Sequence, residues 1–283
     1  MNSMNTMNLT RYALLILAVC APLASAQTAQ PVAAPTPPAA PTPAEPCPAA
    51  SEIFAKAVAA AGGADLIRSQ SSRTQVGTIE MAAQSLKGTI TTKAVSPSLL
   101  LVETEIPGFG KIRQGINATV GWSIDPMRGP SLMDAEELAR VSRESSIDAE
   151  LNPALGCDAV EVLGRSTFRG SPCYKVQLTR AGGKSIRFYE IATGHLIGSV
   201  ETVKSSMGEF EVTTSFSDFV TFSGRTIARV QENTMMGQTQ KLTMSSVEFV
   251  TIDPAVFALP AEIQALVTAT KPSTPTPPAA PAK

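Results

Sequence analysis

The sequence predicts a mainly β protein of the α+β class, built on one strongly curved antiparallel sheet of about 11–12 strands. Two observations predict this sheet: short segments of alternating apolar and polar residues recur along the folded region, and glycine-containing turns join them without crossover helices. A third observation concerns its cover. Only two helical segments accompany the strands, so we expect them to lie over the apolar concave face of the sheet.

The N-terminal residues are typical of a cleavable secretory signal peptide spanning residues 1–26. Arg11 precedes an apolar run from Tyr12 to Ala24, which leads into the small-residue motif A-S-A. A retained membrane anchor is less favoured because the run is short. A lipid-modified Cys20 is also less favoured, since Val19 is bulky for a lipoprotein signal. We therefore expect a periplasmic protein.

Proline-rich segments flank the predicted folded domain, which spans residues 49–267. Residues 31–48 contain eight prolines and residues 271–283 contain five, and such composition favours extended, solvated chain. We assign residues 27–48 to a Pro/Ala-rich linker and residues 268–283 to a Pro-rich disordered tail. Both segments act either as spacers or as solubilising tails.

Charge and cysteine content limit the possible partners and cross-links. The chain has 23 Lys+Arg against 24 Asp+Glu and no basic segment, so we expect no nucleic-acid partner. Cys47, Cys157 and Cys173 remain after signal cleavage. A Cys157–Cys173 disulfide is possible but not favoured, because a turn near Gly170 would place Cys157 far along the partner strand.

The predicted elements before the middle of the chain are one helix and five strands. The helix covers residues 51–63, with Ser51 as the N-terminal cap and Gly62-Gly63 as the stop, and a short helical turn follows at 64–67. Strands are expected at 73–82, 86–95, 98–106, 110–116 and 118–124.

A helical insertion then interrupts the strands at residues 131–148, where Asp134 and Glu137 resemble a capping box. Segment 121–133, which contains the only tryptophan, is interpreted as the hinge between sheet and helical lid, with Trp122 facing either a cavity or the core. Seven further strands are expected at 159–168, 173–179, 185–190, 195–203, 208–220, 225–234 and 239–250.

The motifs of the common enzyme classes are missing. The sequence has no G-x-S-x-G, H-E-x-x-H, C-x-x-C or Walker motif, and its single histidine, His195, falls in a predicted turn. The acidic cluster Asp134, Glu136 and Glu137 is typical of a helix N-terminus. We therefore expect no enzyme, no catalytic residue, no metal site and no cofactor.

Three stretches of the chain resemble a known family. They are AAAGGADLIRSQSS (59–72), GINATVGWSIDPMRGPSLMDAEE (115–137) and residues 216–260, which close in a D-x-x-x-F-x-x-P ending. On these stretches the chain resembles the LolA/LolB-like periplasmic outer-membrane lipoprotein-sorting family of lipoprotein carriers. The resemblance implies an incomplete β-barrel whose apolar concavity, covered by helices, holds acyl chains. It also implies an arginine on the sheet that helps to hold the lid closed, for which Arg113 and Arg229 are two candidates.

The expected function follows from the curved apolar sheet and this resemblance. We expect a non-catalytic periplasmic carrier or chaperone, monomeric, that binds a lipoprotein acyl chain or another lipid in an apolar cavity and contacts membranes peripherally or transiently. The alternative is a sensor or interaction module of the same fold that binds a protein partner at the cell envelope. The candidate ligand-binding residues come mainly from the apolar strand faces: Leu100, Val102, Trp122, Met133, Tyr174, Val176, Leu178, Phe210 and Val212.

Overall fold

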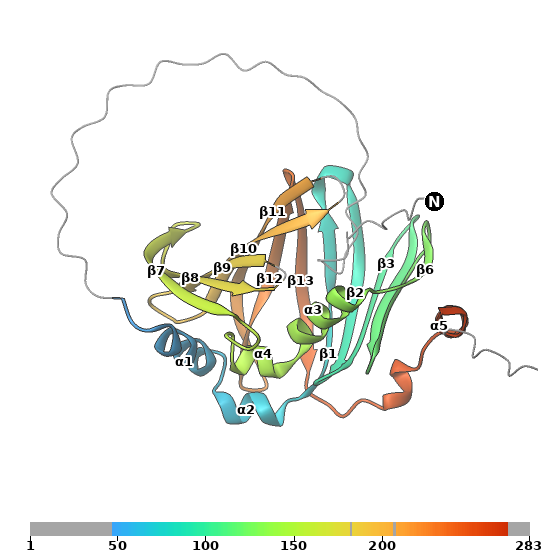
Figure 1. Ribbon diagram of the computed structural model, residues 1–283, viewed down its shortest axis with the longest axis horizontal. Helices are drawn as coiled ribbons and strands as arrows, with labels where there is room; N and C mark the ends of the chain where they lie inside the picture. Colours follow the sequence, from blue (N-terminus) through green and yellow to red (C-terminus); the bar gives the residue numbers. More distant parts are fainter. Residues whose placement is uncertain (1–46, 182, 206–207, 271–283) are drawn as a thin grey trace, which may run out of the picture.

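A single antiparallel sheet of 13 strands dominates the structure, a computed structural model that describes residues 47–181, 183–205 and 208–270 (Figure 1). The spatial order is β6-β5-β4-β3-β2-β1-β13-β12-β11-β10-β9-β8-β7. The strands are β1 (Ser72–Met81), β2 (Leu86–Val95), β3 (Leu99–Ile106), β4 (Gly110–Asn117), β5 (Val120–Asp125), β6 (Gly129–Leu132), β7 (Ala159–Phe168), β8 (Ser171–Arg180), β9 (Gly183–Glu190), β10 (Leu196–Ser205), β11 (Gly208–Phe222), β12 (Arg225–Met235) and β13 (Gln238–Glu248).

The connectivity explains the shape of the sheet. Each strand pairs with its neighbour in sequence, except that the helical segment separates β6 from β7 and that β13 returns to pair with β1. Pairing of the first and last strands places the two chain halves side by side, while β6 and β7 remain the two open edges. The curved, incomplete barrel that the sequence predicts is therefore confirmed (Figure 1).

The strand count exceeds the prediction because residues 129–132 form β6, where the start of the helical insertion was expected. Gly129 has a φ of 77° and allows the tight turn after β5. The Asp125 carboxylate accepts the backbone N–H groups of Met127 and Arg128, at 2.8 and 3.2 Å, and so stabilises that turn. Asp125 is thus a turn-forming residue. The prediction that Asp134 caps the following helix is confirmed, since its side chain accepts the Glu137 N–H at 2.8 Å.

Two pairs of helices accompany the sheet, one pair before β1 and one pair between β6 and β7. They are α1 (Ala50–Ala60), α2 (Ala64–Ser69), α3 (Ala135–Ser145) and α4 (Ile147–Leu151). Helix α1 covers the β7–β9 end, where Ile53 and Phe54 pack against apolar side chains of β8 and β9. Helix α3 lies across the middle of the concave face (Figure 1). Inward-facing residues of several strands therefore lie beneath this one helix.

The start of α1 differs in detail from the prediction. The helix begins at Ala50, so Ser51 lies inside its first turn and does not cap it. The Glu52 carboxylate instead accepts the backbone N–H of Ala49 at 3.0 Å. The helix ends as expected at the Gly62-Gly63 pair, whose φ angles are 118° and 90°.

A C-terminal segment covers part of the outer, convex face. The 3-10 turn η2 (Pro254–Phe257) contacts β3 and β4, and α5 (Ala261–Thr270) contacts β6. The buried side chains of Phe257 and Ile263 anchor this segment, and the Asn117 amide donates to the Phe257 carbonyl oxygen at 2.7 Å. The sequence did not predict α5, which takes in residues 268–270 of the predicted tail; the signal peptide, nearly all of the linker and residues 271–283 lie outside the described residues.

The strand register places Trp122 on this convex face. Residues directly opposite on paired strands share a face, and Trp122 lies opposite Gly115 and Leu132. Val102 and Leu242 belong to one cluster on the inner face. Gln114 lies opposite Val102 and shares that inner face, so its neighbour Gly115 belongs to the other face. The Trp122 ring fills the space that Gly115 leaves, where an added Cβ would approach the ring to 2.7 Å. Trp122 is therefore a core residue of the outer layer.

Candidate functional site

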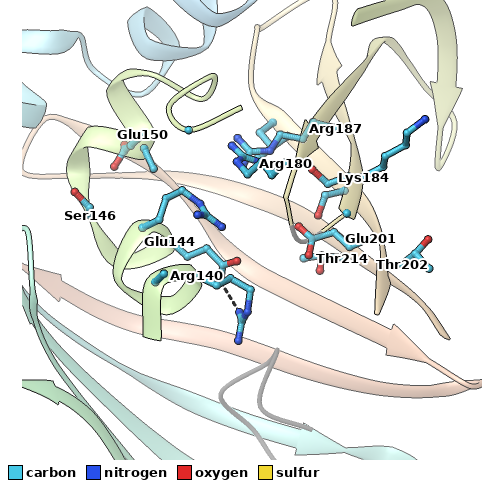
Figure 2. A pocket seen from close by; sticks show the side chains of 18 of the residues that line it. Arg140, Glu144, Ser146, Glu150, Arg180, Lys184, Arg187, Glu201, Thr202 and Thr214 are labelled. Carbon is cyan, nitrogen blue, oxygen red and sulfur yellow. Dashed lines mark hydrogen bonds and ion pairs between the residues drawn. The ribbon is translucent and has the colours of Figure 1, made fainter. Parts of the chain in front are cut away.

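A cavity of about 770 Å³ lies between the α3–α4 segment and the concave face of strands β9–β12 (Figure 2). This volume is within the range of small-molecule binding sites. The sheet contributes alternate residues, as the register requires: Ser199 on β10 lies opposite both Arg187 on β9 and Thr214 on β11, and all three line the cavity. Helix α3 forms the opposite wall.

The lining contains many charged side chains, which the apolar cavity predicted from the sequence does not include. Four glutamates line the cavity: Glu136, Glu144, Glu150 and Glu201. The basic side chains are more numerous: Arg73, Arg140, Arg143, Arg180, Lys184 and Arg187. Leu196 and Phe216 are the large apolar side chains of the lining. The cavity therefore has an excess of positive charge.

Glu144 on α3 is the most perturbed acid in this cavity. Its carboxylate forms an ion pair with Arg140 one turn earlier, with Nη1 and Oε2 3.0 Å apart. Loss of solvation among the cavity walls raises the pKa of Glu144, and the nearby Glu201 raises it further, while Arg140 acts in the opposite direction. Its side chain remains 47% exposed, so solvent screens part of these electrostatic effects.

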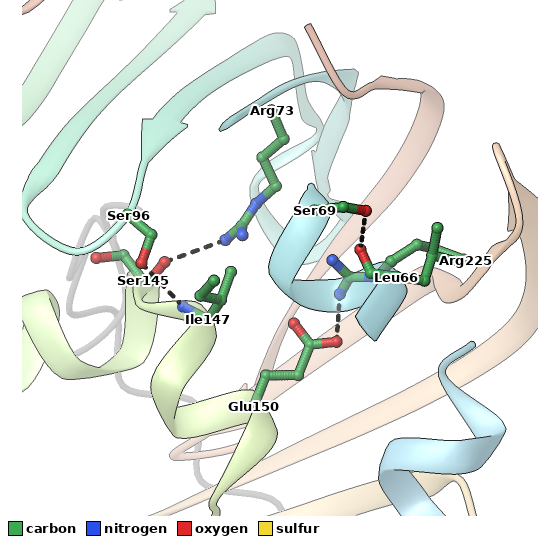
Figure 3. A network of polar contacts seen from close by, with 8 residues as sticks. All are labelled: Leu66, Ser69, Arg73, Ser96, Ser145, Ile147, Glu150 and Arg225. Atoms are coloured by element: carbon green, nitrogen blue, oxygen red, sulfur yellow. Dashed lines mark hydrogen bonds and ion pairs between the residues drawn. The ribbon is translucent and has the colours of Figure 1, made fainter. Parts of the chain in front are cut away.

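Polar contacts hold α4 and the end of α3 to the sheet (Figure 3). Arg225 on β12 forms an ion pair with Glu150 on α4, and its side chain is only 4% exposed. Its guanidinium also lies 5.4 Å from the centre of the Phe249 ring. On the neighbouring part of the sheet, Arg73 donates to the Ser145 carbonyl oxygen at 3.4 Å. Among the ion pairs of the described residues, the one that joins the sheet to α4 is therefore formed by Arg225, whereas Arg229 pairs with Asp218 and neither it nor Arg113 pairs with α3 or α4.

Helix α3 itself is weakly packed. Within it no residue is buried, although Leu138 and Val141 lie partly shielded on its inner side. Most helices in globular proteins are stabilised by an apolar face buried against the core. Displacing α3 would therefore expose no fully buried side chain of its own, and polar contacts join its C-terminal end and α4 to the sheet.

The sequence-predicted binding residues lie outside the lining of this cavity. Val176 and Leu178 are fully buried beneath α1, with Tyr174 beside them. Val102 packs in an inner cluster with Leu100 next to it. The remaining candidates are placed as follows: Val212 is buried on β11, Phe210 is half-buried on the same strand, Met133 is half-buried over Gly121, and Trp122 lies on the convex face.

The basic lining residues were missed although their positions carry a signal. Arg180 is two residues beyond Leu178 on β8, so the alternation that points Leu178 inward also points Arg180 inward. Arg187 lies opposite Val176, and so it too belongs to the inner face. A basic residue at an inward-facing position, beside apolar residues that face the same way, was therefore the available indication of a charged cavity.

Among the residues that the structure describes, the histidine and the three cysteines form neither a disulfide nor a metal site. His195 stacks on Phe219 with ring centres 4.2 Å apart, and burial lowers its pKa. The cysteines Cys47, Cys157 and Cys173 are all free. In the described part of the chain, no group of three or more His, Cys, Asp or Glu side chains is arranged to hold a metal ion. None of the helices in that part is both long and apolar enough to cross a membrane.

Comparisons with known proteins identify the fold. No protein-family model matches the chain, and no curated protein matches it by sequence. Among solved structures, a LolA superfamily protein from Nitrosomonas europaea is similar over 75% of this chain and 99% of its own, with 12% identity and a TM-score of 0.51. A DUF1329 family protein from Desulfovibrio piger is similar over 74% of this chain and 96% of its own, with 11% identity and a TM-score of 0.51. The chain therefore has the LolA-type fold.

Proposed function

We propose that this protein is a non-catalytic carrier or chaperone that holds a lipid or a lipoprotein acyl group between its curved sheet and the α3–α4 cover. One observation carries the proposal: a cavity of ligand size is closed by a helix that buries none of its own residues. A permanent structural helix would be expected to bury an apolar face. A cover held chiefly by polar contacts can leave and return without unfolding the sheet.

The mechanism is opening and closing of this cover, without a covalent step. Release of the Arg225–Glu150 ion pair and of the Arg73–Ser145 contact frees the C-terminal end of α3 and the short helix α4. The sheet remains intact because its strands are joined by backbone hydrogen bonds that do not involve the cover. Leu196, which packs against the apolar cluster beneath α1, also lines the cavity, so an acyl chain would reach this cluster after rearrangement.

The LolA-type fold and the sequence resemblance support this role and its location. We place the protein in the periplasm, exported by the signal peptide at residues 1–26, as a monomer that contacts membranes only transiently. Its Pro-rich ends would separate the carrier domain from the surfaces between which it moves.

The direct test is native mass spectrometry of the chain purified from the periplasm after expression with its own N-terminus. We expect a monomer that carries a co-purified lipid, and we expect the delipidated protein to bind a fluorescent fatty acid. A species with no lipid, together with no binding of the fluorescent fatty acid, would overturn the proposal.

A second candidate function, recognition of an envelope protein partner, is favoured by the open edge of the sheet. Strand β7 has only β8 as a neighbour among the described strands, and its residues alternate between exposed and half-buried. An unpaired edge can accept an extended segment of another chain. Replacement of Leu163, which is 42% exposed, by proline would then abolish capture of a membrane-anchored partner while lipid binding persists.

A further inference from the structure

Three arginines converge on one region of the cavity from different elements. Arg143 comes from the last turn of α3, Arg180 from the end of β8 and Arg187 from β9. Figure 2 shows Arg180 and Arg187 side by side. Burial is the main cause of a lowered pKa of Arg180, and the positive charges of Arg187 and Arg143 lower it further. The Arg180 guanidinium is therefore close enough to Arg187 and to Arg143 to be repelled by both.

The charges of Glu144 and Glu201 act on this cluster from a distance, but the carboxylates of the cavity form their ion pairs with other residues. Glu144 pairs with Arg140, and Glu150 pairs with Arg225. Among the described residues, no ion pair joins Arg143, Arg180 or Arg187 to a carboxylate.

Arg180 also retains unused hydrogen-bonding capacity. Its Nη2 donates to the Pro153 carbonyl oxygen at 2.9 Å, whereas its Nε is buried and has no protein partner. A buried donor without a partner is unfavourable, and so is a cluster of like charges. An anion between the three guanidinium groups would remove both costs, because arginine binds carboxylate and phosphate groups through paired, charge-assisted hydrogen bonds.

We propose that Arg143, Arg180 and Arg187 bind the anionic head group, a carboxylate or a phosphate, of the amphiphile that this protein carries. The inference rests on the proposed carrier function and adds to it the chemistry of the ligand. Phe216 and Leu196 provide apolar wall in the same cavity, where the first part of an acyl chain can leave the head group. One of the three arginines belongs to the cover, so binding of the head group would also hold α3 against the sheet.

The test compares ligands that differ in the charge of the head group or in the presence of an alkyl chain. Binding of dodecanoate, dodecyl phosphate, methyl dodecanoate, acetate and inorganic phosphate is measured by displacement of a fluorescent lipid from the full chain. We expect the two charged amphiphiles to bind at least about tenfold more tightly than the ester, the range expected of a charge-assisted hydrogen bond. We expect acetate and inorganic phosphate to compete far more weakly than either.

Variants then assign this preference to the arginine cluster. Arg143→Gln combined with Arg187→Gln should remove the preference for the charged amphiphiles by weakening their binding much more than that of the ester, whereas the corresponding double lysine variant should retain most of the preference. The matched control is Arg113→Gln, because Arg113 lies on β4 opposite Glu103, in the register of the convex face. Circular dichroism and thermal unfolding check that each variant is folded.

The outcomes separate the two proposals. Equal binding of dodecanoate and its methyl ester would overturn the head-group assignment but leave the carrier function standing. Binding of neither would overturn the carrier function itself. The head-group assignment would also fail if acetate or inorganic phosphate competed as well as dodecanoate, or if Arg113→Gln removed as much of the preference as the double variant.

Discussion

Arg225 on β12 and Glu150 on α4 form an ion pair that links the sheet to its helical cover, and the arginine side chain is almost completely buried. Two further nitrogens of the Arg225 guanidinium are buried without hydrogen-bond partners. Glu150 is therefore the main neutralising partner of a charge that the fold removes from water. This relationship makes the attachment of the cover both energetically significant and dependent on one carboxylate.

Replacement of Glu150 by glutamine should weaken this attachment. The change leaves Arg225 buried without a counter-charge, so we expect the free energy of unfolding to fall by about 1–3 kcal/mol. We also expect faster exchange of a bound fluorescent lipid, since the cover would open more often. Urea unfolding and stopped-flow exchange provide the measurements. Glu136→Gln, a change in the first turn of α3, is the control and should alter stability by less than about 0.5 kcal/mol; equal effects of the two changes would contradict the assignment.

The raised pKa of Glu144 predicts a pH-dependent contribution to stability. Loss of solvation raises the pKa of this carboxyl in the folded state, so the folded protein binds its proton more tightly than the unfolded chain does. The contribution of Glu144 to stability should therefore decrease as the pH rises from the ordinary glutamate pKa, about 4.3, through the raised value.

Unfolding free energies of the wild type and of Glu144→Gln, measured between acidic and neutral pH, test this sign. The variant should become more stable relative to the wild type as the pH rises, because it never carries the poorly solvated charge. Glu262→Gln, a change at an exposed position of α5, is the matched control. A Glu144→Gln difference that stays constant or reverses would show that the ion pair with Arg140 outweighs the loss of solvation.

The position of Trp122 predicts its fluorescence. The only tryptophan of the chain is 3% exposed and lies on the convex face, away from the cavity. We expect blue-shifted emission that changes little when lipid binds. Introduction of a second tryptophan by Phe216→Trp, in the cavity wall, should produce an emission that does respond to lipid. A large response of Trp122 itself would place the ligand, or a coupled rearrangement, at the outer layer.

The three cysteines should differ in reactivity according to their burial. Cys47 is exposed, Cys157 is half-buried and Cys173 is completely buried, and burial raises the pKa of the Cys173 thiol. We expect a thiol reagent to label Cys47 at once, Cys157 more slowly and Cys173 only after unfolding. Mass spectrometry of tryptic peptides over time measures these rates. Rapid labelling of Cys173 in the folded chain would contradict the packing of β8 against β9.

The sheet could be predicted because its signals are local. Alternation along β8 and the glycine-containing turns depend on neighbouring residues, and both survive in the structure. The short strand β6 was missed because Pro130 and the following capping pattern resemble the approach to a helix. Helix α5 was missed although residues 261–267 were assigned to the folded domain, because no helix or strand was predicted beyond the D-x-x-x-F-x-x-P ending at Pro260.

The sequence by itself determined the class of the protein: alternating strands and tight turns require an antiparallel sheet, and a sheet of this size curves because its strands twist. Only the tertiary structure decided which residues meet inside the curve. Pairing of β1 with β13 and the return of α3 over β9–β12 bring Arg143, Arg180 and Arg187 together from separate elements. The same folding turned Trp122 outward, because strand register, which depends on partners distant in the sequence, sets the face of each side chain.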